Sequence, residues 1–422
     1  MQTRLAPEFA GTPDGQEADA ILRRCVHCGF CTATCPTYQL LGDELDGPRG
    51  RIYLIKQMLE GAPVTHATQQ HLDRCLTCRN CETTCPSGVD YGHLLDIGRK
   101  VAQQRITRPA PQRLLRALLR HGLTSPLFGP AMRLGQWLRP WLPPRLRAKV
   151  PPRRRPGAWP RRTHARRVLL LAGCVQPAML PTINAATARV LDAAGLQVVV
   201  APKAGCCGAI RLHLDDPLGA LADMRTNIDA WWPYIEPSDG SPGVEAIVIN
   251  ASGCGVTVKD YGHQLRHDPL YAAKAARISA LARDLSELLP ELVPAWQQRL
   301  GSTLPAGVPQ RLAYHPPCTL QHGQRLRGGV EAGLRALGFA VTLPAESHLC
   351  CGSAGTYSLL QAELADRLRA RKLQHLHAAN DPQVIVSANI GCITHLQAGT
   401  ARPVRHWVEL VDEALARSGA YT

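Results

Sequence analysis

Eight of the sixteen cysteines stand in two copies of one short pattern. The pattern C-x2-C-x2-C-x3-C-P begins at Cys25, Cys28, Cys31 and Cys35, and it returns at Cys75, Cys78, Cys81 and Cys85. Each copy places four thiols within eleven residues and ends at a proline, Pro36 or Pro86, which turns the chain away. This spacing is typical of the ligands of a cubane [4Fe-4S] cluster.

The last cysteine of each copy is expected to serve the other copy. In bacterial ferredoxins with two clusters, the fourth cysteine of each run crosses over in this way. We therefore predict site A from Cys25, Cys28, Cys31 and Cys85, and site B from Cys35, Cys75, Cys78 and Cys81. The crossing would hold two [4Fe-4S] clusters in one small core, close enough for electrons to pass between them.

Two other uses of these cysteines are less well supported by the spacing. Zinc usually takes its four ligands as two separated pairs, whereas here four cysteines follow one another closely. A disulfide framework is disfavoured because no secretory signal opens the chain and cysteines three positions apart on one turn make poor bridges. A reducing compartment is expected.

The other eight cysteines form a second duplicated pattern, C-x31-C-C-G followed by one more cysteine. The first copy defines site C, which comprises Cys174, Cys206, Cys207 and Cys254. The second copy defines site D, which comprises Cys318, Cys350, Cys351 and Cys392. The distance from the first cysteine to the vicinal pair is the same in both copies, which indicates an internal duplication.

The elements around sites C and D alternate between apolar runs and helical stretches. In the first copy these are 168–172, 183–194, 197–201, 219–231 and 246–250, and in the second 311–314, 330–337, 340–343, 362–377 and 384–387. Such alternation predicts parallel sheets of βαβ units. Every cysteine of the pattern follows a predicted strand end, and the carboxyl ends of parallel strands share one edge. Each half should therefore gather its four sulfurs into one site.

The occupant of sites C and D stays open at this stage. An iron-sulfur cluster in at least one half is favoured, and a redox dithiol, empty structural thiols or zinc are the alternatives. His315 either orients site D or is a loop histidine bonded to the backbone. His395 follows Cys392 at C-x2-H spacing, although a lone histidine at this spacing is usually not a ligand, and the first half has Thr257 at the matching place.

The net positive charge of the chain comes from one segment. The formal net charge is +15, yet residues 97–191 contain twenty Lys and Arg and no Asp or Glu. Prolines recur between residues 105 and 167, so long regular elements are not expected there. Two short amphipathic stretches, 113–120 and 132–142, combine Leu and Trp with Arg, as a helix lying on an anionic membrane surface does. A linker that docks on an acidic partner or stays solvated is the alternative, and nucleic-acid binding is disfavoured.

These observations predict an α+β chain of several domains. A helical ferredoxin-like domain should span residues 1–104, an Arg/Pro-rich linker 105–166, and two α/β repeats with parallel sheets 167–300 and 301–422. The most apolar run, 168–180, has thirteen residues and includes Gln176 and Pro177, so it is too short and too polar for a membrane span and a soluble protein is expected. Since no G-x-G-x-x-G follows a strand and no P-loop motif occurs, neither a dinucleotide nor a nucleotide site is predicted.

The motifs together resemble a known family. The duplicated C-x31-CCG pattern is similar to the cysteine-rich (CCG) domain of the heterodisulfide reductase B subunit and of iron-sulfur subunits for lactate utilisation and anaerobic glycerol-3-phosphate oxidation. In the reductase the final element is C-x2-C and can hold a noncubane cluster, whereas each half here keeps one cysteine. The stretches 25–38, 42–53 and 75–81 resemble the iron-sulfur subunit of bacterial glycolate oxidase, and the similarity covers essentially the whole chain.

The resemblance implies an electron-transfer subunit that binds neither glycolate nor flavin itself. Flavoprotein subunits would oxidise glycolate to glyoxylate, and this chain would pass the electrons towards quinone at the inner face of the cytoplasmic membrane. The alternatives are a subunit of a related lactate or glycerol-3-phosphate dehydrogenase, or a catalytic subunit like heterodisulfide reductase. The last would be favoured by a fifth cysteine in each CCG site, which the sequence lacks.

Overall fold

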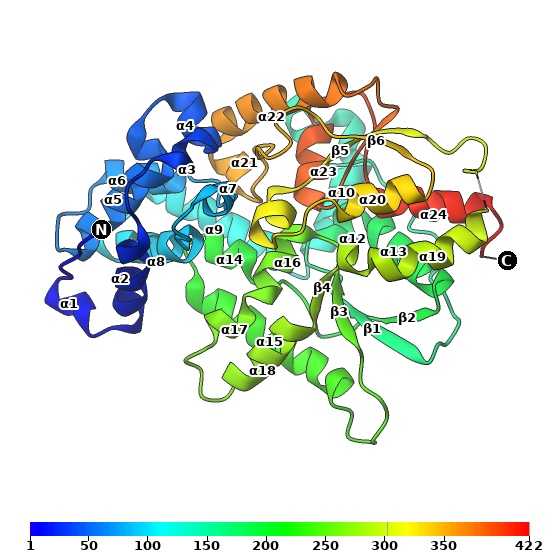
Figure 1. The fold of residues 1–422 in the computed structure, drawn as a ribbon, viewed down its shortest axis with the longest axis horizontal. Coiled ribbons are helices and arrows are strands. Elements are labelled where there is room, and N and C mark those ends of the chain that lie inside the picture. Colours follow the sequence, from blue (N-terminus) through cyan, green and yellow to red (C-terminus); the bar gives the residue numbers. More distant parts are fainter. Residues whose placement is uncertain (302, 422) are drawn as a thin grey trace.

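The N-terminal hundred residues fold as helices around an apolar core. The computed structural model describes residues 1–301 and 303–421. The helices are α1 (Pro7–Ala10), α2 (Pro13–Arg24), α3 (Phe30–Ala33), α4 (Pro36–Leu41), η1 (Glu44–Asp46), α5 (Pro48–Leu59), α6 (His66–Asp73), α7 (Asn80–Thr84) and α8 (Tyr91–Arg105). Leu22, Ile55 and Leu94 are fully buried where α2, α5 and α8 pack together, and Cys25, Cys75 and Cys81 belong to the same core. The cysteine runs are thus built into the core of this domain (blue, Figure 1).

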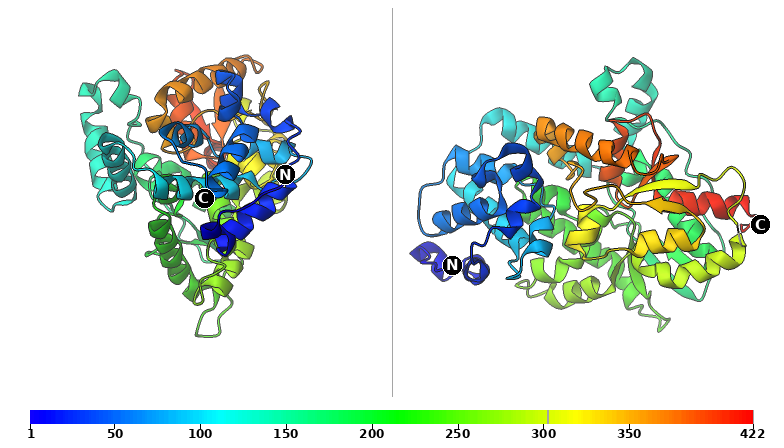
Figure 2. Two further views of the ribbon diagram at one scale, coloured as in Figure 1. Left: turned by 90° about the vertical axis from the view of Figure 1, so that its left-hand side faces the viewer. Right: turned by 45° about the horizontal axis from the view of Figure 1, so that its top comes forward.

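The basic segment contains longer helices than its prolines suggested. It forms α9 (Ala110–Thr124), α10 (Phe128–Leu138), η2 (Arg139–Trp141) and α11 (Pro144–Arg147). The expectation that proline excludes long elements was wrong for α9, because Pro109 is its N-cap and Pro111 lies in its first turn, where no backbone N–H is needed. Figure 2 shows the part around α10 standing out from the rest of the molecule.

Two four-stranded parallel sheets form the remainder of the chain. The first contains β1 (Arg166–Leu170), β2 (Leu196–Val199), β3 (Ala246–Ile249) and β4 (Ala282–Asp284) in the order β2-β1-β3-β4. The second contains β5 (Arg311–His315), β6 (Ala340–Thr342), β7 (Val384–Ser387) and β8 (Val404–His406) in the order β6-β5-β7-β8. The register pairs Val168 with Ala246 in the first sheet and His315 with Ser387 in the second. The predicted duplication and parallel sheets are confirmed.

Helices connect the strands and cover both sheets. In the first repeat these are α12 (Gln176–Met179), α13 (Pro181–Ala193), α14 (Ala209–His213), α15 (Pro217–Ile235), α16 (Ser252–Lys259), α17 (Tyr261–Gln264), α18 (Ala272–Leu281), η3 (Leu285–Leu288) and α19 (Leu289–Leu300). In the second they are η4 (Thr319–Gly323), α20 (Gly329–Ala336), α21 (Tyr357–Leu360), α22 (Ala362–His377), α23 (Ile390–Gln397) and α24 (Trp407–Arg417).

The two repeats share one hydrophobic core. A single cluster of buried side chains includes Val190 of α13, Trp296 of α19 and Leu410 of α24. The indole N–H of Trp296 donates to the carbonyl oxygen of Val190 at 2.8 Å. Figure 1 shows α13, α19 and α24 running together at the side away from the blue domain. The repeats are therefore joined by packing as well as by the chain. Among the described residues, no helix is both long and apolar enough to cross a membrane.

Candidate iron-sulfur sites

The four cysteines of site A line one cavity. Cys25, Cys28, Cys31 and Cys85 surround it together with Pro48 and Ile52 of α5, and Cys81, which also lines the cavity of site B, forms part of its wall. The turn after Cys25 reverses direction through His27 and Gly29, which both have positive φ, so the thiols of a short segment can face inward. Burial raises the pKa of the Cys31 thiol to about 11, and the neighbouring thiols Cys25, Cys85 and Cys28 act in the same direction. Cys85 thus lies with the first run, although it belongs to the second.

Site B shows the reciprocal arrangement. Cys35 lines a cavity with Cys75, Cys78 and Cys81, and the wall is completed by Arg51 and Tyr91. The local backbone repeats that of site A, because Thr77 and Arg79 have the positive φ values found at His27 and Gly29. The Tyr91 hydroxyl donates to the Cys75 Sγ at 3.6 Å. The structure brings together the two crossed sets of four cysteines.

A buried ion network lies beside site B and was not foreseen as part of it. Arg51 and Asp46 are each about 1% exposed, and their closest charged atoms lie 3.4 Å apart. Asp46 also accepts from His71 at 3.1 Å and from Arg74 at 2.8 Å, while Arg51 donates to Thr37 at 3.2 Å. Negative charge on Cys75 and Cys35 raises the pKa of the Arg51 guanidinium and outweighs the opposing effect of burial. Arg51 therefore brings a fixed positive charge next to thiols that would be negative as ligands.

Site C is assembled at the carboxyl ends of three neighbouring strands. Cys174 follows β1, Cys206 and Cys207 follow β2, and Cys254 lies in α16 after β3. Hydrogen bonds from the thiols of Cys174 and Cys207 lower the pKa of Cys206, and the contact with Cys206 raises that of Cys174. Cys207 in turn contacts Cys254. All four sulfurs of the predicted set thus lie together.

Site D repeats this plan in the second sheet. Cys318 follows β5, Cys350 and Cys351 follow β6, and Cys392 lies in α23 after β7. The Sγ atoms of Cys318 and Cys350 are 3.7 Å apart, and the thiol of Cys351 contacts that of Cys392. All four side chains are buried. Asn389 Nδ2 donates to the Cys392 Sγ at 3.6 Å, so the thiol also has a neutral donor beside it.

Histidines and a lysine distinguish site D from site C. His315, the last residue of β5, is fully buried, and neither ring nitrogen has a hydrogen-bond partner among the described residues. The backbone bond considered for His315 is therefore absent, whereas His395 Nε2 does bond the Ala365 carbonyl oxygen at 3.2 Å. Lys372 is 2% exposed. Burial lowers the pKa of Lys372, and negative charge on Cys351, Cys350 and Cys318 opposes that effect.

The glycine of each CCG motif is required by close packing. Gly208 and Gly352 have φ values of 95° and 90°, a region that favours glycine. A Cβ atom on Gly352 would stand 2.6 Å from the backbone oxygen of Ala365 in α22, and one on Gly208 would stand 3.1 Å from that of Ala220 in α15. The amide N–H groups of Gly208 and Gly352 each donate, at 3.4 Å, to the first sulfur of their vicinal pair. The motif thus places a backbone donor and a helix directly behind the cysteines.

Sites B and D adjoin each other across the domain boundary. Cys78 of site B belongs to the same buried cluster as Cys318 and Cys350 of site D. Asn80 Nδ2 donates to the carbonyl oxygen of His348 at 3.2 Å, two residues before Cys350. Negative charge on Cys318 contributes to the raised pKa of Cys78, whose largest cause is burial. The dicluster region and the second repeat are thus in direct contact at their cysteines.

Sites C and D also contact each other through their helices. The hydroxyl groups of Ser252 and Thr319 lie 2.7 Å apart, and each is close in sequence to a cysteine of its own site. The Gly253 amide donates to the Asn389 side chain at 3.4 Å. Sites A, B, D and C therefore form a continuous series within one chain.

The donor sets fit thiophilic metal centres. Clusters of four thiols with buried, partly charged surroundings suit iron-sulfur clusters or zinc, and they do not suit Mg²⁺ or Ca²⁺, which bind oxygen. None of the sixteen cysteines is in a disulfide, so all of them can serve as ligands. The roles of Arg51, Tyr91, Asn80 and Lys372 were not predicted from the sequence. The only signal for Arg51 was its place in the 42–53 stretch that carries the family resemblance.

Fold and sites together define an iron-sulfur protein with a dicluster domain and a duplicated cysteine-rich domain. The family model of the 4Fe-4S dicluster domain matches residues 21–89, and that of the cysteine-rich domain matches residues 168–259 and 312–397. The chain is 55% identical over 419 residues to the glycolate oxidase iron-sulfur subunit of Escherichia coli (strain K12). This match covers 99% of the present chain and 100% of the relative.

More distant relatives are similar over the whole chain or over part of it. A probable glycolate oxidase iron-sulfur subunit of Bacillus subtilis is 31% identical over 90% of this chain and 89% of the relative. Lactate utilization protein A of Geobacillus thermodenitrificans is 25% identical over 58% of this chain and 98% of the relative. The chain belongs to the family of glycolate oxidase iron-sulfur subunits. The resemblance stated from its motifs is confirmed, and the chain is an electron-carrying subunit of an oxidoreductase.

Proposed function

We propose that this chain conducts electrons from flavoprotein subunits, which oxidise glycolate to glyoxylate, towards a quinone at the inner face of the cytoplasmic membrane. The observation that carries the proposal is the crossed convergence of eight cysteines into two adjoining cavities. A metal that only stabilised the fold would not need a second metal site directly beside it. The similarity to glycolate oxidase iron-sulfur subunits supports glycolate as the substrate of the partner subunits.

Sites A and B would each hold one [4Fe-4S] cluster. Such a cluster, when bound, supplies one-electron redox chemistry. The protein contributes eight sulfur ligands, the Arg51 charge beside site B and the Tyr91 hydroxyl that donates to Cys75. These groups favour negative charge on the sulfurs, and hydrogen bonds and charge near sulfur are known levers on cluster potential. Sites C and D would hold a further iron-sulfur cluster or zinc.

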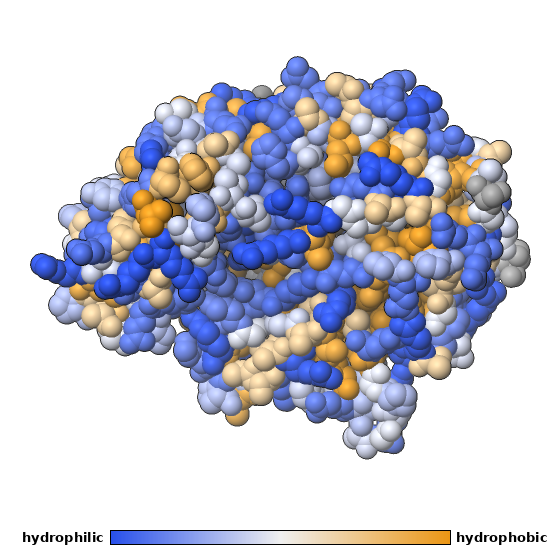
Figure 3. Space-filling model, viewed as in Figure 1, coloured by the Kyte–Doolittle hydropathy of each residue, from blue (hydrophilic) through white to orange (hydrophobic). Residues whose placement is uncertain are grey.

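The exposed edge of site A supports a flavoprotein contact at that position. The structure describes all sixteen cysteines, and only Cys28 among them is exposed. Val26 and Phe30 beside it are 66% and 61% exposed, and we call these three residues the donor edge. Large apolar side chains left in solvent at one place indicate a contact surface. Figure 3 shows apolar atoms gathered near α3 at the left of the molecule, as one of several apolar patches on this face.

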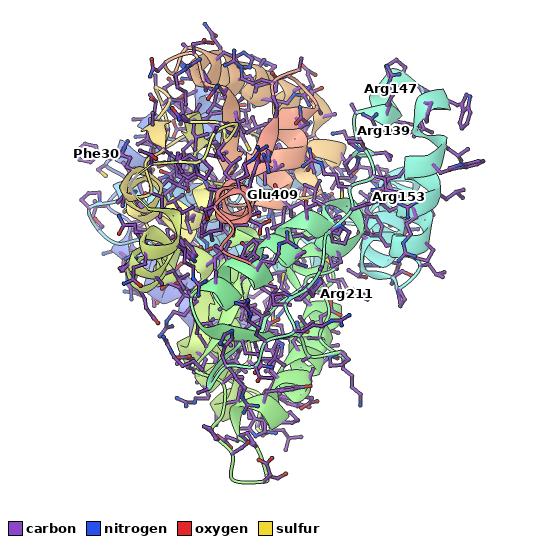
Figure 4. The ribbon with its side chains drawn as sticks, turned by 90° about the vertical axis from the view of Figure 1, so that its right-hand side faces the viewer. Phe30, Arg139, Arg147, Arg153, Arg211 and Glu409 are labelled. Carbon is purple, nitrogen blue, oxygen red and sulfur yellow. The ribbon has the colours of Figure 1, made fainter. Side chains whose placement is uncertain are left out.

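Exposed aromatic, leucine and arginine side chains support a membrane contact on the basic segment. Trp137 and Trp141 of this segment are 69% and 72% exposed and stack edge to face, and Leu114 and Leu118 of α9 are each 62% exposed. Exposed arginines stand beside them, as an anionic surface requires. Figure 4 shows Arg139, Arg147 and Arg153 on the opposite side from Phe30. A flavoprotein on the donor edge would therefore leave the basic segment free.

Not all of the basic segment is available for this contact. Arg108 and Arg116 are largely buried and pair with both Asp73 and Asp215, which fastens the segment to the dicluster domain and the first repeat. Their role is structural. The membrane role thus falls to the residues from α10 onwards, together with the leucines of α9.

The test is iron and acid-labile sulfide analysis with EPR on the anaerobically purified complex and on the chain alone. We expect two interacting [4Fe-4S] signals in both, reduction by glycolate only in the complex, and no flavin in the isolated chain. Glycolate turnover by this chain alone, or a complex whose glycolate oxidation leaves every iron-sulfur signal of the chain oxidised, contradicts the proposal.

A further inference from the structure

His315 is a buried imidazole without a hydrogen-bond partner beside the thiols of site D. Its side chain is 0% exposed, and both ring nitrogens lack a partner among the described residues. A ring nitrogen of His315 and the Sγ atoms of Cys351 and Cys392 all lie within 4.8 Å of one another. A buried polar group left unpaired destabilises the folded protein. A ligand between these three atoms would remove that destabilisation.

We propose that His315 is a direct ligand of the metal centre at site D, together with the thiolates of Cys351 and Cys392. This inference rests on the proposed function in one respect, namely that site D holds a thiophilic metal. Imidazole nitrogen joins cysteine sulfur in zinc sites, and it replaces cysteine on one iron of some iron-sulfur clusters. Zinc or the iron of a cluster is therefore the chemical class that site D takes.

The position of His315 on the sheet supports this role. It is the last residue of β5, the strand that lies between β6 and β7, and these two strands lead to Cys351 and Cys392. The Ser387 hydroxyl donates to the backbone oxygen of His315 at 2.9 Å, which fixes the end of the strand. The imidazole is thus presented from the centre of the sheet edge, between the segments that carry its two sulfur partners.

The first repeat has no counterpart to this nitrogen donor. His315 stands three residues before Cys318, and the residue three before Cys174 is Leu171, which is 2% exposed. A leucine cannot bind a metal. The duplication thus produced one site with four sulfurs and another with four sulfurs and an imidazole, so the two sites would differ in metal affinity or in reduction potential.

The experiment compares wild type with His315→Ala and His315→Cys in the complex purified anaerobically. Iron and zinc are quantified, and the ligands are identified by nitrogen hyperfine coupling in EPR if the centre is a cluster, or by zinc X-ray absorption if it is zinc. We expect a nitrogen ligand in wild type and loss of the metal of one site in His315→Ala. In His315→Cys the metal should return without the nitrogen signature. His395→Ala is the matched control, since His395 lies three residues after Cys392 and bonds to backbone, and it should retain both metal and nitrogen signature.

Three outcomes overturn the inference. They are a wild-type site D without metal, a metal at site D bound by sulfur alone, and a His315→Ala protein with unchanged metal content and spectra. The wild-type measurement stands even if a variant fails to fold. Reduction of sites A and B by glycolate is recorded on the same samples. Its absence in wild type would refute the proposed function and leave the ligand assignment to be judged by the spectra alone.

Discussion

Thr83 Oγ1 lies 2.8 Å from His322 Nδ1, and this contact joins the helix between Cys81 and Cys85 to the turn that follows Cys318. His322 Nε2 lies 2.9 Å from the His348 carbonyl oxygen, so Nε2 carries the proton. Nδ1 then accepts from the threonine hydroxyl and also from Arg327 Nη2 at 3.2 Å. Burial lowers the pKa of His322 to about 4, so the ring is neutral near pH 7. The Thr83 hydroxyl and the neutral His322 imidazole thus add a second hydrogen-bonded link to the Asn80 bond that already joins sites B and D.

Thr83→Val should weaken this contact without changing either set of cysteines. Loss of one hydrogen bond of this kind costs about 1 kcal/mol. We expect a lower melting temperature and slower glycolate-driven quinone reduction, while glycolate still reduces sites A and B at the wild-type rate. Thr34→Val is the control, because Thr34 bonds Thr84 within the dicluster domain at 3.1 Å. Equal quinone reduction in the two variants would show that the Thr83 contact has no part in transfer.

Cys85→Ser should damage the cluster at site A, not the cluster held by its neighbours in sequence. The reason is that Cys85 lines the cavity of Cys25, Cys28 and Cys31. Cys35→Ser is the reciprocal variant and should damage site B. EPR of the reduced proteins distinguishes the two signals. If each substitution removed only the cluster of its own run, ligation would not cross.

Replacing the donor edge should uncouple the chain from its flavoprotein partner. The double variant Val26→Ser with Phe30→Ser removes two exposed apolar side chains, and an anchor of this kind contributes at least about tenfold to binding. Glycolate should then reduce the clusters slowly or not at all, while dithionite reduces them as in wild type. Leu218→Ser with Leu270→Ser is the matched control, because both leucines are 78% exposed on the first repeat. Size exclusion shows whether the complex has dissociated, and wild-type assembly with a wild-type rate would place the partner elsewhere.

The basic segment should bind anionic liposomes in a salt-dependent way. The variant replaces four exposed arginines by glutamine, namely Arg153, Arg155, Arg161 and Arg162. Each cation near the surface contributes about 1 kcal/mol, and the screening length falls from about 10 Å at 0.1 M salt to about 3 Å at 1 M. Trp137→Ala with Trp141→Ala should weaken the binding that survives high salt.

Co-sedimentation with liposomes measures these effects, and size exclusion reports whether the flavoprotein subunits stay attached. The control replaces four exposed arginines outside the segment, namely Arg4, Arg24, Arg277 and Arg335. Should the first variant lose its partner subunits and bind vesicles like wild type, the segment is a protein contact. If variant and control lost vesicle binding equally, the net charge of the chain would determine binding, and the position of the arginines would not matter.

Deprotonation of His93 should lower the stability of the folded protein at alkaline pH. Burial alone would lower its pKa, yet hydrogen bonds to Asp260 and Asp90 outweigh burial and raise it to about 10. A raised folded-state pKa adds stability that is complete below the ordinary value of 6.5 and is lost as the pH rises through about 10. The melting temperature of wild type should therefore fall more steeply between these values than that of His93→Gln. Parallel curves would mean that the Asp90, His93 and Asp260 contact does not join the dicluster domain to the first repeat as an ion network.

The cysteine sites could be predicted because the residue type and the spacing of their ligands are recognisable in the sequence. Apolar runs that end just before a cysteine identified six of the eight strands. The strands β4 and β8 were missed, since Ala282–Asp284 and Val404–His406 have three residues each and too few apolar ones for a pattern. Arg51 and Lys372 could not be found, because charged side chains are mostly exposed and only tertiary contacts reveal a buried one. His315 was noticed, but its lack of a partner is a property of the folded protein.

The core that passes without interruption from one cysteine-rich repeat into the other has a kinetic consequence. Trp296 packs among side chains of both halves, so sites C and D cannot move apart by a hinge between the repeats. A rigid frame of this kind keeps the distance between two redox centres constant and limits how far their surroundings rearrange when an electron arrives. The reorganisation energy of transfer between the halves should then be small, and the rate should be governed by distance and driving force.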